Sequence, residues 1–150
     1  METDLTDSFF SWDATSLADG TYLLRIVADD SPSNPVGASL SAERLSDPFD
    51  VDNNPPQIGP IQGAVSGSSL RLEFEATDSF SDMGEVFYSV NAADWDLLPP
   101  IDGFTDSPHE EYRMELKNLG AGEVTVVVKA SDAAGNSATS KKVVQIGASR

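Results

Sequence analysis

The sequence contains no cysteine, one histidine, few basic residues and no long apolar run. Without cysteine the chain can form no disulfide, thiolate metal site or cysteine nucleophile. No apolar run approaches the roughly 20 residues that a membrane-spanning helix needs, so we expect no membrane insertion. The opening residues, METDLTDSFF, lack the basic and apolar regions of a signal peptide. We therefore interpret the chain as a fragment, with any signal peptide lying outside it.

Acidic residues strongly outnumber basic ones. The chain has 25 Asp and Glu against 9 Lys and Arg, a formal net charge of −16. Such a field repels phosphate backbones and anionic lipids, so the sequence predicts no nucleic-acid binding. A well-solvated surface explains the charge, and attraction of divalent cations is the alternative. With 39% apolar and 23% charged residues, the composition is that of a globular protein.

The segment LGAGEVTVVVKASD, residues 119–132, organises the chain. Its valines predict a central β-strand, and AAGNS after it predicts a turn. Residues 17–30 carry the same signature, with Leu, Gly, a branched residue, Ala and Asp at matching places 102 positions earlier. Phe10 and Trp12 align with Tyr112 and Met114 at the same offset. A repeat of about 100 residues is one immunoglobulin-like sandwich long.

Short alternating segments separated by turn signals predict an all-β protein without helices. The fold class we expect is an antiparallel immunoglobulin-like β-sandwich of about seven strands, preceded by a partial sandwich domain. The domains we expect are a C-terminal part of one β domain (1–51), a stiff Pro-rich linker (52–55) and a complete sandwich (56–148). The strands we expect span 9–13, 22–28, 43–51, 58–61, 70–76, 85–90, 111–116, 123–130 and 141–146.

The partial domain has too few strands to cover its own apolar face. We expect this face to be covered by the second domain or by another copy of the chain, so self-association is one predicted partner interaction. The residues that need cover are Phe10, Trp12, Tyr22, Leu24 and Ile26.

Residues 122–137, GEVTVVVKASDAAGNS, resemble the closing strands of bacterial Ig-like and fibronectin type III-like repeats. Residues 51–56, VDNNPP, resemble the linker between such repeats, and residues 12–22, WDATSLADGTY, resemble the matching stretch of similar modules. The resemblance covers most of residues 9–147. It implies a non-catalytic extracellular or cell-surface module of a large bacterial protein. Such a module acts as a spacer or presents neighbouring domains, which would be its partners.

The linker region is also a candidate calcium site. Calcium takes six to eight oxygen ligands, which clustered Asp and Asn side chains supply. The linker resembles the calcium-binding junctions of cadherin-type modules. Asx turns and loop caps are the alternative role. The residues are Asp50, Asp52, Asn53, Asn54 and Asp132, with Asp78 or Asp82 as further ligands from nearby loops.

The loop 91–108 is a candidate binding site for a glycan or a protein ligand. Trp95 is flanked by carboxylates, and Asp96 and Asp102 could accept hydroxyl hydrogen bonds while the ring stacks on a sugar. The alternative is that the loop covers the sandwich, with Trp95 and Phe104 packed inward.

We predict no enzymatic activity. His109 is the only histidine, and no Gly-x-Ser-x-Gly elbow exists to make it part of a nucleophilic triad. Among 25 acidic residues, pairs suited to glycoside hydrolysis can always be chosen and carry little information. Residues 132–136, DAAGN, are most simply a hairpin turn with Gly135 at positive φ.

Overall fold

The structure is a computed structural model, and it describes residues 9–147 of the chain. The chain divides into two compact units, with the boundary between Asp52 and Asn53. Each unit is described by itself. Among the described residues, no helix has the length and apolar character needed to cross a membrane.

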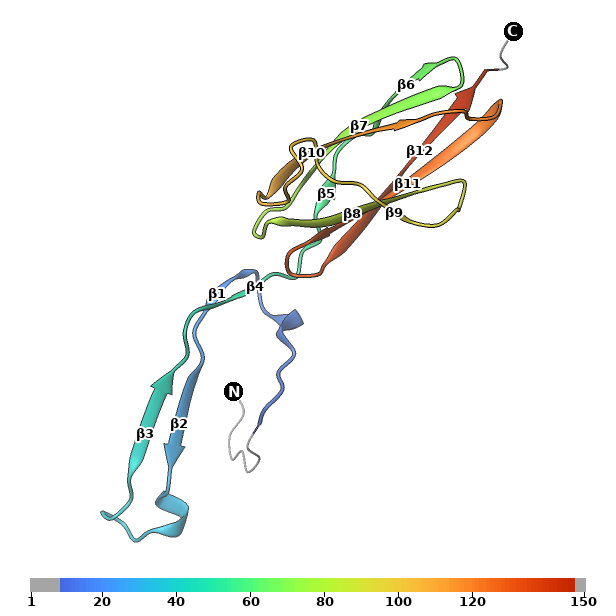
Figure 1. Cartoon of the computed structure of the whole chain (residues 1–150). Coiled ribbons are helices and arrows are strands. Elements are labelled where there is room, and N and C mark those ends of the chain that lie inside the picture. Colours follow the sequence, from blue (N-terminus) through green and yellow to red (C-terminus); the bar gives the residue numbers. More distant parts are fainter. Residues whose placement is uncertain (1–8, 148–150) are drawn as a thin grey trace. The chain divides into compact units, whose positions relative to one another are not determined.

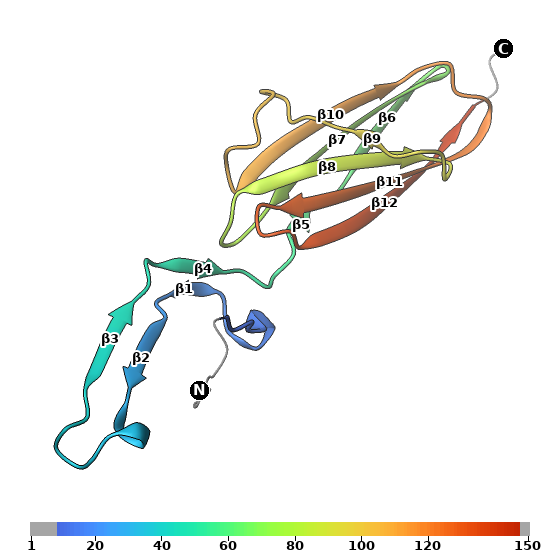
Figure 2. The ribbon, with the colours of Figure 1, turned by 60° about the horizontal axis from the view of Figure 1, so that its bottom comes forward.

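The second unit contains two four-stranded sheets in which every pair is antiparallel (Figures 1 and 2). In the first sheet, β7 lies between β10 on one side and β5 and β6 on the other. In the second sheet the order is β12-β11-β8-β9. The strands of the first sheet are β5 (Gln57–Ile58), β6 (Gln62–Ser66), β7 (Ser69–Thr77) and β10 (His109–Leu116). Those of the second are β8 (Met83–Val90), β9 (Asp96–Leu97), β11 (Gly122–Asp132) and β12 (Ser137–Ile146).

The hydrophobic core is formed by inward-facing residues of these two sheets. Burial alternates along the central strands because successive side chains of a strand point to opposite faces. Fully burying one such side chain stabilises the fold by about 1.5–3 kcal/mol. The predicted antiparallel two-sheet sandwich is therefore confirmed. The core includes Leu70, Leu72, Phe74 and Ala76 of β7 and Val124, Val126, Val128 and Ala130 of β11.

Strand β6 is not among the strands that we expected, which left residues 62–69 between strands 58–61 and 70–76. The segment QGAVS pairs with β7 over its whole length, from Gln62 opposite Glu73 to Ser66 opposite Ser69. All five of its residues are exposed, so it carries no apolar signal that sequence patterns could detect. Gly67, with φ of 61°, lies in the tight turn that follows.

The first unit is a long two-stranded ribbon rather than a layered structure. Strand β1 (Gly20–Tyr22) pairs with β4 (Phe49–Val51), and β2 (Arg25–Asp29) pairs with β3 (Ser41–Leu45). Between the two pairs, Ser46 keeps the ribbon together, because its Oγ accepts from Leu24 N at 2.9 Å and its N–H donates to Leu24 O at 2.8 Å. Every residue of β2 and β3 is exposed.

Residues 9–13 do not form the strand that we predicted. They are irregular and lead into a short 3₁₀ helix, η1 (Ala14–Ser16), while a second one, η2 (Ser31–Ser33), follows β2. Asp13 caps η1 by accepting bonds from Thr15 N at 2.9 Å and Thr15 Oγ1 at 2.7 Å, and these bonds lower the pKa of its carboxyl group. A strand needs a neighbour, and within the described part of the first unit no strand pairs with residues 9–13.

Candidate functional site

The turn between β11 and β12 is organised by Asp132. Its side chain is buried, with only 4% of the residue exposed. Oδ1 accepts from Asn136 N at 2.8 Å, and Oδ2 accepts from Asn136 Nδ2 at 3.0 Å. Gly135 has φ of 96°, a left-handed conformation that glycine adopts without strain. The predicted hairpin turn is therefore confirmed.

Asn136 also ties this turn to the segment that enters the second unit. Its Nδ2 donates to the main-chain oxygen of Asn54 at 3.3 Å. Pro55 and Pro56 follow, and Pro56 is fully buried. Both prolines hold φ near −65°, so this entry segment is restrained by its covalent structure as well as by hydrogen bonding.

Asp78 lies just beyond the end of β7, at the same end of the sandwich. Its Oδ1 accepts from the N–H groups of Phe80 and Ser81 at 2.8 and 2.9 Å, forming an Asx turn. Its Oδ2 is buried and has no hydrogen-bond partner among the described residues. Carboxylate oxygens of Asp78 and Asp132 lie within 4.8 Å of one another. Two acidic side chains from opposite sheets therefore converge here.

A depression of about 420 Å³ adjoins Asp78. Its lining is formed by the entry segment and by the end of β7, so the acidic end of the sandwich has room for a small polar ligand or ion. The lining residues are Asn54, Pro55, Pro56, Gln57, Thr77, Asp78 and Ser79.

The predicted calcium ligands belong to both units of the chain. Asp50 belongs to β4 of the first unit, where its Oδ1 accepts from Thr21 Oγ1 at 2.7 Å. Asp52 ends the first unit, and Asn53 begins the second. Chain connectivity alone keeps the Cα of Asp52 within about 7 Å of the Cα of Asn54. Within the second unit, Asn54, Asp78 and Asp132 come together.

Asn136 is the residue of this end that sequence reasoning missed. It bonds both Asp132 and Asn54, residues that lie 4 and 82 positions away in the chain. Its place in the DAAGN turn indicated a local role, but nothing in the sequence indicated the long-range bond. Asp82 contributes a main-chain oxygen, which accepts from Ala133 N at 2.8 Å.

The Trp95 loop is anchored by residues other than those we expected. Leu98 is buried, and its N–H donates to Val86 O at 2.8 Å. Trp95 and Phe104 are 49% and 69% exposed, so the alternative in which both rings pack inward is wrong. Asp102 accepts from Phe104 N at 3.1 Å. The ring of Trp95 is available to solvent, and its glycan role stays a prediction.

Asp96, the third residue of the predicted glycan site, lies in β9. It pairs with Tyr88 of β8 and is exposed. Its position on a paired strand fixes its backbone, whereas Asp102 lies in a turn. The two acids are therefore presented by different local structures of the same loop.

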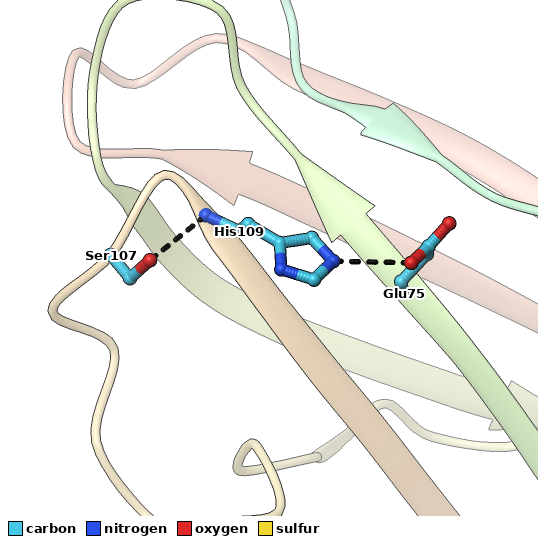
Figure 3. A network of polar contacts seen from close by, with 3 residues as sticks. All are labelled: Glu75, Ser107 and His109. Atoms are coloured by element: carbon cyan, nitrogen blue, oxygen red, sulfur yellow. Dashed lines mark hydrogen bonds and ion pairs between the residues drawn. The ribbon is translucent and has the colours of Figure 1, made fainter.

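His109 begins β10 and makes an exposed polar contact with Glu75. Its Nε2 lies 3.1 Å from Glu75 Oε2, and both side chains are about half exposed (Figure 3). Ser107 Oγ accepts from the main-chain N–H of His109 at 3.1 Å (Figure 3). The serine hydroxyl therefore bonds the backbone and not the imidazole, which is not the arrangement of a nucleophile activated by a base.

Tyr112 places a polar hydroxyl group in the core. It is 1% exposed, and its ring stacks on Phe74 with centroids 5.1 Å apart. Its hydroxyl is buried and has no hydrogen-bond partner among the described residues. Burial, followed by the negative charges of Glu110 and Asp102, raises the pKa of Tyr112 to about 12.

Comparison with solved structures finds similar proteins, whereas comparison of the sequence with known families does not. No family model and no curated protein matches the sequence. Among solved structures, the chain is similar to the PKD1 domain of Vibrio anguillarum Epp, at 14% identity and a TM-score of 0.49. The match covers 64% of this chain and 98% of that chain. The assignment of a β-sandwich to the second unit stands on its own two sheets and their shared core.

Proposed function

We propose that the chain is a non-catalytic spacer module of a larger extracellular protein, in which the second unit holds its neighbours at a fixed separation. The observation that carries this proposal is the position of the unit's two ends. Asn54, at the entry, is bonded to the turn that precedes β12. Ile146, at the exit, pairs with Gly122 at the far end of β11.

The separation follows from the length of the last strand. Strand β12 has 10 residues, from Ser137 to Ile146. At about 3.3 Å per residue, a strand of this length places the exit roughly 30 Å from the entry. A chain that enters at one end and leaves at the other adds the length of the unit to a tandem array.

Both ends of this spacer are held by specific interactions. At the entry, Pro56 is buried, and Gly59 N donates to Glu75 O at 2.8 Å just after β5 pairs with β7. At the exit, Ile146 is 1% exposed. The directions of the entering and leaving chain are thus fixed by burial and pairing up to the last residue of β12.

Because the chain has no cysteine, this geometry can be tested with two introduced spin labels. The exposed residues Gln57 and Gln145 are replaced by cysteine, and the distance distribution is measured by double electron–electron resonance. We expect one narrow distribution near the roughly 30 Å given by the strand rise. In a matched sample that also carries Asn136→Ala, we expect a broader distance distribution, because the entry segment is held less firmly. A broad distribution in the parent chain, or one centred well below this value, would refute the spacer geometry.

A divalent-cation site is a second candidate function, favoured by the convergence of Asp78 and Asp132. Two unit charges within 4.8 Å of one another repel by roughly 3 kcal/mol or more at an effective dielectric constant of about 20. A hard cation would remove this repulsion and engage the Asp78 Oδ2 atom. Carboxylate and main-chain oxygens are the ligands calcium prefers. In this proposal calcium binds at the acidic end and stiffens the entry segment.

Thermal unfolding in EDTA and in millimolar calcium, with magnesium as the charge-screening control, tests this second function. A calcium concentration ten times the dissociation constant would stabilise the folded unit by about 1.4 kcal/mol. For a unit of this size we expect a rise in Tm of several degrees. Asp78→Asn should abolish the rise, whereas Asp94→Asn, which removes one charge from an exposed loop, should keep it. Equal Tm values in EDTA and calcium would exclude the site.

A further inference from the structure

The first unit exposes several large apolar side chains. Trp12 and Phe49 meet edge to face with centroids 6.5 Å apart, and Tyr22 lies 6.3 Å from Phe49, but this small cluster does not bury the ribbon. A group of exposed large apolar side chains in a small unit of a soluble protein indicates a site of interaction. The exposed fractions are 50% for Phe10, 47% for Trp12, 44% for Leu24 and 62% for Ile26.

The second unit shows what the same positions do in a complete sandwich. Moving 102 positions along the chain leads from each of these residues to a core residue of β10 or β11. The equivalent residues are Tyr112 (1% exposed), Met114 (6%), Val126 (0%) and Val128 (0%). The exposed apolar residues of the first unit therefore correspond in sequence to core residues of the second unit, but they are not buried.

A shared hydrogen-bond motif supports this equivalence at atomic level. In the second unit, Asp132 N donates to Asn136 O at 3.1 Å, and Asp132 Oδ1 accepts from Asn136 N at 2.8 Å. In the first, Asp30 N donates to Leu40 O at 3.2 Å, and Asp30 Oδ1 accepts from Leu40 N at 2.7 Å. Asp30 and Asp132 are 102 positions apart. Each closes the loop of its hairpin in the same way, although the first loop is longer.

The strand pairing agrees with this motif. Arg25 pairs with Leu45 in the first ribbon, and the equivalent Val127 pairs with Lys141 in the β11–β12 hairpin. Strands β1 and β2 together cover the positions of β11, while β3 and β4 take the place of β12. The first unit is therefore the equivalent of the last hairpin of the sandwich.

In the second unit, these core positions pair with strands that precede them in the chain. On β10, Tyr112 pairs with Phe74 and Met114 with Leu72, both from β7. On β11, Val126 pairs with Val90, from β8. The missing cover of the first unit therefore has a defined chemistry, namely antiparallel strands with alternating apolar residues like those of β7 and β8.

We propose that the apolar face of residues 9–51 is covered by a half-sandwich equivalent to residues 53–108, supplied by a segment that comes before it in the natural polypeptide. The irregular conformation of residues 9–13 fits this proposal. Their equivalents in β10 form a strand only by pairing with β7. Once a β7-like strand is present, residues 9–13 pair with it and complete a second sandwich.

A second copy of the chain is the less favourable occupant. Residues 1–52 contain 11 acidic and 2 basic residues, so two such units would bring two charges of −9 together. A second copy of the ribbon would also supply another equivalent of β11 and β12, not the β7-like and β8-like strands that the face lacks. Charge and strand type both favour the upstream segment.

A chimaeric chain tests this proposal. Residues 53–108 are placed directly before residue 7, which is the equivalent of residue 109, and the rest of the chain follows unchanged. Hydrogen exchange of residues 20–45 is compared between the 150-residue chain and the chimaera. We expect rapid exchange and a monomer in the 150-residue chain, and at least a hundredfold slower exchange of these residues in the chimaera. Leu24→Ser with Ile26→Ser in the chimaera should abolish the gain.

Three results would overturn the proposal. Protection of residues 20–45 in a dimer of the 150-residue chain would assign the face to a second copy. Protection in a monomer would show that the chain covers the face itself. An unchanged exchange rate in the chimaera would show that a half-sandwich does not fit. Two double variants of the 150-residue chain provide an independent measurement. Leu24→Ser with Ile26→Ser should leave the sedimentation coefficient and the unfolding of residues 57–146 unchanged. The equivalent change in the second unit, Val126→Ser with Val128→Ser, should unfold that unit.

Discussion

Replacing Tyr112 by phenylalanine should stabilise the second unit, although removing a core hydroxyl group often destabilises a protein. The ring would keep its stacking on Phe74, while the buried hydroxyl, which has no partner among the described residues, would be lost. A buried polar group without a hydrogen bond costs about 1–3 kcal/mol. We therefore expect the free energy of unfolding to rise by about 1 kcal/mol or more in Tyr112→Phe at pH 7. Tyr112→Ala should lower it by about 3–5 kcal/mol, because it also creates a cavity.

The same substitution should change the response to alkaline pH. Burial raises the pKa of Tyr112 from 10.0 to about 12 in the folded state. Between these values the unfolded state loses the phenolic proton while the folded state keeps it, so stability falls as pH rises from 10 to 12. At 1.36 kcal/mol per pH unit the loss is about 3 kcal/mol. Tyr112→Phe lacks this contribution, so the advantage of the variant should grow by that amount across this range.

Urea unfolding followed by the fluorescence of Trp95 provides the assay. A Trp12→Phe background confines the signal to the second unit, and both proteins are measured between pH 7 and pH 12. The other titrating groups are common to both proteins and cancel in the difference. If Tyr112→Phe were less stable than the parent at pH 7, or if the difference did not change above pH 10, the hydroxyl would have a compensating partner and the reasoning would fail.

Three further predictions concern the packing and polar contacts of the second unit. Leu72→Ala, at a fully buried position of β7, should lower the free energy of unfolding in urea by about 2–5 kcal/mol, whereas Leu97→Ala, at a position 55% exposed, should change it by less than about 0.5 kcal/mol. Gly84→Ala would bring a Cβ atom to 2.7 Å from Asp132 O and should lower Tm, while Gly120→Ala meets nothing within 4 Å and should leave Tm nearly unchanged. Asn136→Ala removes the side-chain donor to Asp132 and Asn54 and should cost about 1–3 kcal/mol, together with faster hydrogen exchange at the start of β12.

The parts of the fold that the sequence predicted are those with a strong local pattern. Alternating apolar and charged residues marked β7, valines marked β11, and the DAAGN turn joined β11 to β12. Strand β6 lacked such a pattern because it is exposed and rich in small residues. Residues 9–13 had an alternating pattern but no strand to pair with in the described part of their unit. A local pattern therefore predicts a strand only when a pairing partner is present.

The candidate site could be predicted only in part for a similar reason. Asp132 was a candidate because it lies in a recognisable turn. Asp78 comes near it because β7 and β11, in opposite sheets, end at the same end of the sandwich. The bond from Asn136 to Asn54 likewise depends on the tertiary fold. Sequence spacing alone favoured Asp50, whose carboxylate instead bonds Thr21 within the first unit.

The opposite placement of entry and exit determines how the second unit would respond to tension. A force applied between Asn54 and Ile146 acts along β12 and shears it against β11. The two strands are paired over 10 positions, from Gly122 with Ile146 to Ser131 with Ser137. Because the hydrogen bonds of an antiparallel pair lie perpendicular to the strands, such a load is shared by all of them at once and cannot open them one by one. The strand that sets the length of the proposed spacer is thus also the element that would resist its extension.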